Sequence, residues 1–265
     1  METQSLQELG YPEDRNYRAG SPHLLHWHLY DRLTAMLLET LSQVVDAGLP
    51  PTVIEVGAGH GALTEPVLAA GARVTATDMS RPSVERLANR YHTNVAFQAV
   101  FDPDGSLAVL GDQRFSLVVC SSVLHHIPDY IGFLEGPMLD HLGRGGAFIS
   151  LQDPLWYPSV GPLTHRLDRG SYLLWRMRQG SYRQGIATFG RRLRRVYDET
   201  NPADMVEYHV VRQGVDHQAI ERLLTAHFEE VELQTYWSTV SSPLQWIGDR
   251  LGRPNTFAFR ATRRR

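Results

Sequence analysis

Residues 52–64 read Thr-Val-Ile-Glu-Val-Gly-Ala-Gly-His-Gly-Ala-Leu-Thr, and this stretch decides the fold. Val53, Ile54 and Val56 predict a buried parallel strand, and a glycine-rich turn then leads into a predicted helix over 62–70. Glycine accepts positive φ and lets a ligand approach the backbone closely. The helix behind the turn offers free N–H groups and the positive end of its dipole. Together these features predict a nucleotide-type site at the carboxyl edge of a sheet.

The glycine pattern alone leaves two ligands open, because Gly57-x-Gly59-x-x-Ala62 also fits the dinucleotide fingerprint. Three carboxylates near predicted strand ends narrow the choice: Glu55, Asp78 and Asp102. An acid after the second strand binds ribose hydroxyls in either case. Glu55 discriminates between the two kinds of ligand, because a carboxylate beneath the pyrophosphate of a dinucleotide would repel it. A ligand that carries a sulfonium and an ammonium group, and no phosphate, suits this position.

Composition bounds the class of protein. The chain has 265 residues, 42% of them hydrophobic, which is enough for one large domain with a real core. The net charge of −3 argues against nucleic acid as a partner. All 26 basic residues are Arg, so Schiff-base and P-loop lysine chemistry are excluded. The single cysteine, Cys120, cannot form an internal disulfide.

The sequence predicts a protein of the cytoplasm. Its amino terminus lacks the basic and apolar pattern of a signal peptide. No run approaches the ~18 consecutive apolar residues of a membrane span.

Strands and helices alternate over the first part of the chain, which predicts a doubly wound, parallel α/β sheet. The predicted strands cover 52–56, 73–78, 94–100, 115–120, 147–151, 229–239 and 255–262. The predicted helices cover 23–45, 62–70, 80–91, a segment ending near 141, and 216–228, and residues 143–146 are a predicted turn. The last two strands are expected to pair antiparallel at the edge of the sheet.

We expect a single domain over residues 1–265. Its predicted parts are an N-terminal helical cap (1–50), a ligand-binding core (51–153), a helical insertion or lid (154–212), and a C-terminal helix with an edge hairpin (213–265). The insertion mixes aromatic residues with arginines. Such a surface suits a small-molecule acceptor, and it would also suit the interface of a homodimer.

Three motifs together resemble the class I S-adenosylmethionine-dependent methyltransferases of the small-molecule type. They are Val53-Ile-Glu-Val-Gly-Ala-Gly-His-Gly61, Val74-Thr-Ala-Thr-Asp78, and Phe115-Ser-Leu-Val-Val-Cys-Ser-Ser-Val-Leu-His-His-Ile-Pro128, followed by Gly145-Gly146. The resemblance covers about residues 50–153. It implies a seven-stranded Rossmann-like sheet with an antiparallel edge strand, and S-adenosylmethionine as the cofactor, converted to S-adenosylhomocysteine.

The resemblance also implies roles for individual residues. Glu55 would lie near the ammonium group of the cofactor, Asp78 would hold the ribose hydroxyls, and Asp102 would bind the adenine amine. The family commonly has Gly-Asp one residue earlier than Asp102, where this chain has Phe101, and packing of Phe101 on adenine is the alternative to this role of Asp102. The remaining cofactor residues implied are Gly57, Ala58, Gly59 and Gly61 under the methionine portion, Met79 on adenine, and Ser121 and Ser122 beyond the fourth strand.

Candidate catalytic groups follow the fourth and fifth strands. His125, His126 and Asp153 lie beside the expected methyl group, and histidine suits proton transfer near neutral pH. A base is needed only if the acceptor keeps its proton at neutral pH. No metal site is expected. The residues expected to line the cap or contact substrate are Tyr11, Tyr17, His26, Trp156 and Tyr157.

The function expected from these features is transfer of a methyl group to O, N or C of a small molecule, with secondary metabolism as the setting by analogy. Two alternatives stay open. The methyltransferase fold could be repurposed as a cyclase or a cofactor-binding module, or the protein could be an NAD(P)-dependent oxidoreductase.

Overall fold

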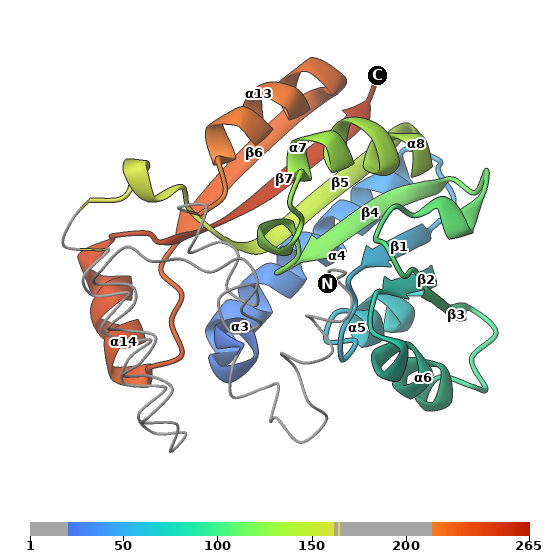
Figure 1. The fold of residues 1–265 in the computed structure, drawn as a ribbon, viewed down its shortest axis with the longest axis horizontal. Coiled ribbons are helices and arrows are strands. Elements are labelled where there is room, and N and C mark those ends of the chain that lie inside the picture. Colours follow the sequence, from blue (N-terminus) through green and yellow to red (C-terminus); the bar gives the residue numbers. More distant parts are fainter. Residues whose placement is uncertain (1–20, 162–163, 165–213) are drawn as a thin grey trace.

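The computed structural model describes residues 21–161, 164 and 214–265. They form a seven-stranded sheet in the order β3-β2-β1-β4-β5-β7-β6 (Figure 1). The strands are β1 Thr52–Val56, β2 Arg73–Asp78, β3 Phe97–Phe101, β4 Phe115–Ser121, β5 Leu142–Pro154, β6 Phe228–Tyr236 and β7 Thr256–Arg264.

The first five strands are parallel, and β7 runs antiparallel to both of its neighbours, β5 and β6. This topology confirms the doubly wound sheet and the antiparallel pairing of the last two strands. The order reverses at β1 and β4, which is where α/β sheets bind ligands, outside the carboxyl ends of the strands.

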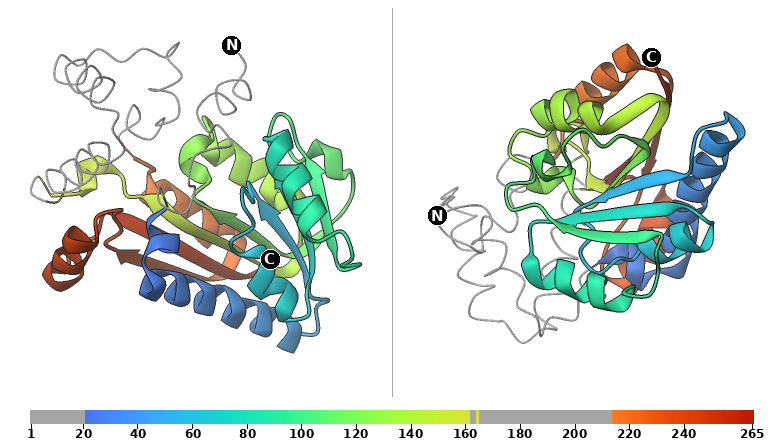
Figure 2. Two further views of the ribbon diagram at one scale, coloured as in Figure 1. Left: turned by 90° about the horizontal axis from the view of Figure 1, so that it is seen from below. Right: turned by 90° about the vertical axis from the view of Figure 1, so that its right-hand side faces the viewer.

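Helices cover both faces of the sheet (Figure 2). One face packs against α4 and α5 through a cluster that includes Leu37, Val53 and Val119. The other face packs against the segment that follows β4 and against α13, through Ile54, Met138 and Leu224. The α-helices are α3 Pro22–Leu25, α4 Trp27–Asp46, α5 Thr64–Ala69, α6 Arg81–Arg90, α7 Tyr130–Phe133, α8 Leu139–His141, α13 His217–His227 and α14 Ser242–Leu251.

Short helical segments complete the described chain. They are the 3-10 turns η1 Ala108–Leu110, η2 Leu124–His126 and η4 Tyr157–Ser159, and the π-helical segment η3 Leu134–Met138. Pro137 lies inside η3. Because proline lacks an N–H group, the α-helical ladder cannot continue through it, which accounts for the irregular helix between α7 and α8.

The amino-terminal helix differs from its prediction. The expected helix over 23–45 is broken at His26, whose backbone is extended (φ −107°, ψ 103°), so α3 and α4 are separate. Helix α4 lies along a face of the sheet, with Leu29 to Val44 contributing its buried side (Figure 2). Residues 21–50 therefore build part of the core.

Three further boundaries were wrong, and one helix was missed. The helix expected from 62 begins at Thr64, because turns occupy the residues after Gly59. The third strand begins at Phe97 rather than 94. The expected turn at 143–146 belongs to β5, which already pairs with Phe115 at Leu142 and then bulges. Helix α14 was not predicted at all.

Within the part of the chain that the structure describes, no helix has both the length and the apolar character needed to cross a bilayer.

Candidate active site

The glycine turn after β1 is shaped so that only glycine fits at two of its positions. Gly57 and Gly61 have φ of +63° and +72°, a region that side chains disfavour. A Cβ atom on Gly57 would lie 2.6 Å from Val123 Cγ2, and one on Gly61 would lie 2.5 Å from Leu87 Cδ2. The turn therefore packs directly against the loop after β4 and against α6.

Asp78 fastens this turn to β2. Its Oδ2 accepts a hydrogen bond from the Gly59 N–H at 2.7 Å, and its Oδ1 accepts one from the Ser80 N–H at 2.7 Å. The Ala58 N–H donates to the Thr77 carbonyl at 3.0 Å. Burial raises the pKa of Asp78, and the hydrogen bonds from Ser80 and Gly59 oppose that shift. The carboxylate thus sits directly beside the glycine turn.

Glu55 brings a second carboxylate to the same place. It is buried, and its Oε2 accepts a hydrogen bond from Thr64 Oγ1 at 2.5 Å, at the start of α5. Burial raises the pKa of Glu55 to about 7. Because Glu55 and Asp78 both lie at the turn and the amino end of α5, a pyrophosphate there would meet like charges. A ligand with a cationic end suits this electrostatic environment better.

Asp102 supplies a third carboxylate, just beyond β3. Its backbone N–H donates to the Asp78 carbonyl at 3.0 Å, and its Oδ2 accepts from the Leu107 N–H at 3.0 Å. Its Oδ1 is buried and has no hydrogen-bond partner among the described residues. Burial raises the pKa of Asp102. Because a buried acceptor without a donor is costly, Oδ1 marks a place where a ligand can supply an N–H group.

Two apolar side chains lie near these acids. Phe101 pairs with Asp78 across the β2–β3 ladder, and the guanidinium carbon of Arg81 lies 4.2 Å from the centre of the Phe101 ring. A Cβ atom on Gly105 would lie 3.5 Å from the sulfur of Met79. Both residues predicted to contact adenine are therefore found beside Asp78 and Asp102.

The ends of β4 and β5 are joined by an unusual pair of backbone conformations. Ser122 and Gln152 both have positive φ, +55° and +63°. The Ser122 N–H donates to the Leu151 carbonyl at 2.8 Å, and Ser121 pairs with Leu151 in the ladder. Non-glycine residues in this conformation typically cluster at functional sites.

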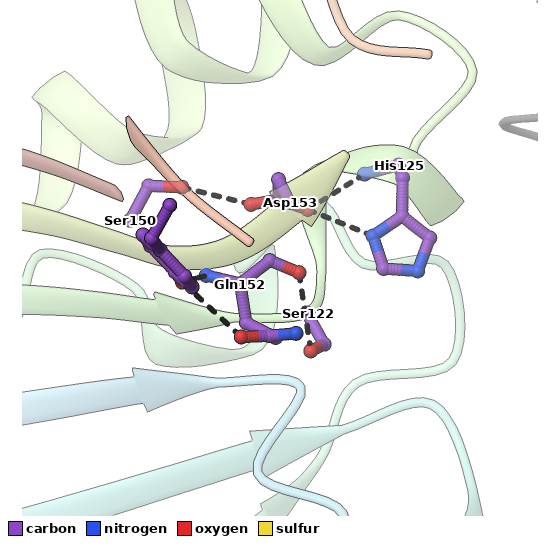
Figure 3. Close-up of polar contacts among 6 residues, drawn as sticks. Ser122, His125, Ser150, Gln152 and Asp153 are labelled. Atoms are coloured by element: carbon purple, nitrogen blue, oxygen red, sulfur yellow. Dashed lines mark hydrogen bonds and ion pairs between the residues drawn. The ribbon is translucent and has the colours of Figure 1, made fainter. Parts of the chain in front are cut away.

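Asp153 and His125 form a hydrogen-bonded pair next to these residues (Figure 3). His125 Nδ1 lies 2.8 Å from Asp153 Oδ1, and the His125 backbone N–H donates to the same oxygen at 3.2 Å. Ser150 Oγ donates to Asp153 Oδ2 at 2.8 Å. His126 contacts His125 ring to ring, with centroids 4.0 Å apart. The structure thus brings the three candidate catalytic residues together and pairs His125 with the carboxylate.

The residues predicted to line the cap lie in several different parts of the chain. His26 is buried, with Nε2 2.8 Å from the Thr239 carbonyl oxygen, so its ring joins the amino-terminal helices to the loop after β6. Trp156 and Tyr157 follow β5 at η4 and are half-buried. Tyr11, Tyr17 and most of the predicted insertion lie outside the described residues.

Sequence reasoning missed several polar residues that support the site. They are Thr64 on Glu55, Ser150 on Asp153, and Gln152 with its partners Tyr236 and Ser238. A signal for two of them existed, because Ser150 lies within the apolar run 147–151 and Gln152 directly follows it. Polar residues at buried strand positions need partners, and the sequence does not say which partners they find.

The sheet order, the glycine turn and the acids at the carboxyl ends of β1, β2 and β3 define a class I methyltransferase fold. Residues 54–148 match the sequence model of a family described as a methyltransferase domain. The ubiquinone biosynthesis O-methyltransferase of Proteus mirabilis (strain HI4320) is 30% identical over 100 residues. That match spans 37% of this chain and only 40% of the relative's length.

Two solved structures share the fold over almost the whole chain. The N-methyltransferase NodS from Bradyrhizobium japonicum WM9, in complex with S-adenosyl-L-homocysteine, superposes with a TM-score of 0.54 at 17% identity, covering 99% of this chain and 97% of NodS. The plantazolicin methyltransferase BpumL, in complex with SAH, gives 0.51 at 13% identity, covering 99% and 95%. The family model shows a methyltransferase domain over residues 54–148, and the two likenesses show the class I methyltransferase fold.

Proposed function

We propose that this protein binds S-adenosylmethionine at the carboxyl ends of β1 to β4 and transfers its methyl group to O, N or C of a small molecule. The observation that carries this proposal is the buried Oδ1 of Asp102, which lacks a donor among the described residues. Asp102 is joined to Asp78 through one backbone hydrogen bond, and Asp78 holds the glycine turn. An adenosine with a free amine fits these two acceptors.

Each acid then has a distinct task. Asp102 Oδ1 accepts from the adenine amine, the carboxylate of Asp78 accepts from the ribose hydroxyls, and Glu55 faces the cationic methionine end. The bound cofactor supplies a methyl group on a positively charged sulfur. Such a displacement needs the nucleophile, carbon and sulfur to be in line, so the protein contributes mainly alignment.

The similar proteins support methyl transfer but differ in acceptor. One is described as an O-methyltransferase, one as an N-methyltransferase, and one acts on plantazolicin. We propose that residues 1–30 of the predicted cap and residues 154–212 of the predicted insertion hold the acceptor. A cytoplasmic location, a role in secondary metabolism and a homodimer through the insertion belong to the same proposal.

The test is mass spectrometry of the protein incubated with S-adenosylmethionine and a metabolite extract. We expect S-adenosylhomocysteine to form together with a methylated product. Binding of the cofactor without any S-adenosylhomocysteine would contradict methyl transfer and favour a fold repurposed for binding or another reaction. An Asp78→Ala variant provides the control for background turnover, because it should no longer bind the cofactor.

A further inference from the structure

The strand β5 contains one extra residue that turns Asp153 to the opposite face of the sheet. Ser150 pairs with Phe259 and Asp153 pairs with Phe257, so three steps along β5 match two along β7. Side chains alternate between faces in a strand. Ala147, Ile149 and Leu151 face the α4 side, and by alternation Asp153 would follow them. The bulge at Gln152 instead puts Asp153 on the same side as Ser150.

The conformation of Gln152 makes this bulge possible, and two residues from the carboxy-terminal part of the chain hold it. The Gln152 N–H donates to the Tyr236 hydroxyl at 3.1 Å, and that hydroxyl donates to Gln152 Oε1 at 3.1 Å. Gln152 Nε2 donates to Ser238 Oγ at 2.5 Å. The left-handed conformation is unfavourable for a non-glycine residue, so this network offsets a strained backbone.

Asp153, once turned, holds the ring of His125 (Figure 3). The Asp153 side chain is 0% exposed and that of His125 is 12% exposed. An ionised carboxylate is an acceptor only, so the hydrogen bond to Nδ1 puts the imidazole proton on Nδ1. In this tautomer Nε2 carries the lone pair that can accept a proton. The strained backbone at Gln152 and the buried carboxylate of Asp153 thus fix the proton of the His125 ring on Nδ1.

We propose that His125 is a general base and that the methyl acceptor is therefore a hydroxyl group, of an alcohol or a phenol. This inference rests on the proposed function. Asp153 is a positioning residue: it fixes the tautomer of His125 and stabilises the imidazolium that forms. Gln152 acts one step further back, by turning Asp153 toward His125.

The acceptor O–H bond breaks and its proton goes to His125 Nε2, while the oxygen lone pair forms a bond to the methyl carbon. The electron pair of the broken carbon–sulfur bond stays on sulfur, which becomes the neutral thioether. A hydroxyl needs this help because it keeps its proton at neutral pH. A neutral amine attacks through its own lone pair and does not need a base beforehand.

The first test locates the transferred methyl group. The protein is incubated with trideuteromethyl-labelled S-adenosylmethionine and a metabolite extract, and the labelled product is analysed by fragmentation and NMR. We expect the label on oxygen. A label on nitrogen or carbon would overturn this inference while leaving the proposed function intact. An absence of S-adenosylhomocysteine would count against the proposed function itself.

The second test compares variants of the pair. Asp153→Asn keeps an acceptor for the His125 N–H groups but removes the negative charge, and we expect kcat to fall about 10²-fold or more, with KM and cofactor affinity little changed. Ser150→Ala removes a donor from the same carboxylate and leaves the His125 bond, so its loss should be below about tenfold. An equal loss in both variants, or a change in KM alone, would contradict the assignment.

A readout that does not depend on turnover is the state of the ring. In ¹⁵N-labelled protein with S-adenosylhomocysteine bound, at mildly alkaline pH, His125 should show a proton on Nδ1 with a strongly deshielded resonance. That resonance should persist in Gln152→Gly, because glycine accepts positive φ, and weaken in Gln152→Val. A wild-type ring protonated on Nε2 would overturn the inference.

Discussion

At the scale of single residues, the site is built from carboxylates that the fold has removed from water. Glu55, Asp102 and Asp153 are all 5% exposed or less. Each is held by hydrogen bonds from neighbouring groups, which is what makes burial of a charge tolerable. Asp102 differs, because Oδ1 lacks a partner among the residues that the structure describes. That single atom is the most direct structural indication of a ligand.

Replacing Asp102 tests this indication. Asp102→Asn can still accept from the Leu107 N–H, but its NH₂ group would face the adenine amine. We expect the affinity for S-adenosylhomocysteine to fall by at least about tenfold. Wild-type protein should disfavour S-inosylhomocysteine, which has a carbonyl in place of the amine, and the variant should lose most of that preference. Calorimetry with both ligands measures this, and an unchanged preference would contradict the role of Oδ1.

The sequence could indicate these acids but not their states. Acids at the ends of parallel strands meet at one edge of the sheet, so Glu55, Asp78 and Asp102 were predictable as a group. The choice between His125 and His126 was not, because it depends on where Asp153 points. That direction follows from the single extra residue in β5, and a one-residue change of register is invisible in a hydrophobicity pattern.

At the scale of elements, the glycine turn works because the loop after β4 packs into the space that a side chain would fill. Gly57→Ala should lower the free energy of unfolding by about 2–4 kcal/mol, through positive φ and overlap with Val123. In the double variant that also carries Val123→Ala, the total loss should be smaller than the sum of the two single losses by about 1 kcal/mol or more. Urea denaturation of the two single variants and the double variant measures this coupling, and strictly additive losses would refute the contact.

The elements that sequence analysis placed well are those with a strong local signal. Strands β1 and β4 are short and mostly apolar, β2 alternates apolar residues with threonine, and all three were found. The break at His26 and the start of β5 at Leu142 depend on contacts with distant residues, Thr239 and Phe115. Helix α14 is held by tertiary packing, since a Cβ atom on Gly248 would lie 2.2 Å from the Trp237 ring. Local patterns carry little information on such contacts.

At the scale of the whole molecule, Glu55 links stability to pH. Its pKa is raised by burial from 4.5 to about 7, so the folded protein binds this proton more tightly than the unfolded chain. The contribution of Glu55 is therefore fully present below pH 4.5 and is lost as the pH rises to about 7. The loss should total about 3 kcal/mol.

The measurement is the difference in unfolding free energy between cofactor-free wild type and Glu55→Gln across this pH range. Other titrating groups are common to both proteins, and glutamine keeps an acceptor for Thr64. We expect the unfolding free energy of wild type, relative to that of Glu55→Gln, to fall as the pH rises and to level off above about 7. A difference that does not change with pH would show that folding leaves the pKa of Glu55 at its ordinary value.

The assembled sheet edge is expected to select an adenosyl ligand, and isothermal calorimetry tests this selection most directly. We expect wild-type protein to bind S-adenosylmethionine and S-adenosylhomocysteine and to give no signal with NADH or NADPH. Asp78→Ala should weaken the binding of both adenosyl ligands by at least about a hundredfold, because the complex loses two charge-assisted hydrogen bonds between the carboxylate and the ribose. Binding of a nicotinamide cofactor in place of the adenosyl ligands, or full affinity in Asp78→Ala, would contradict the account.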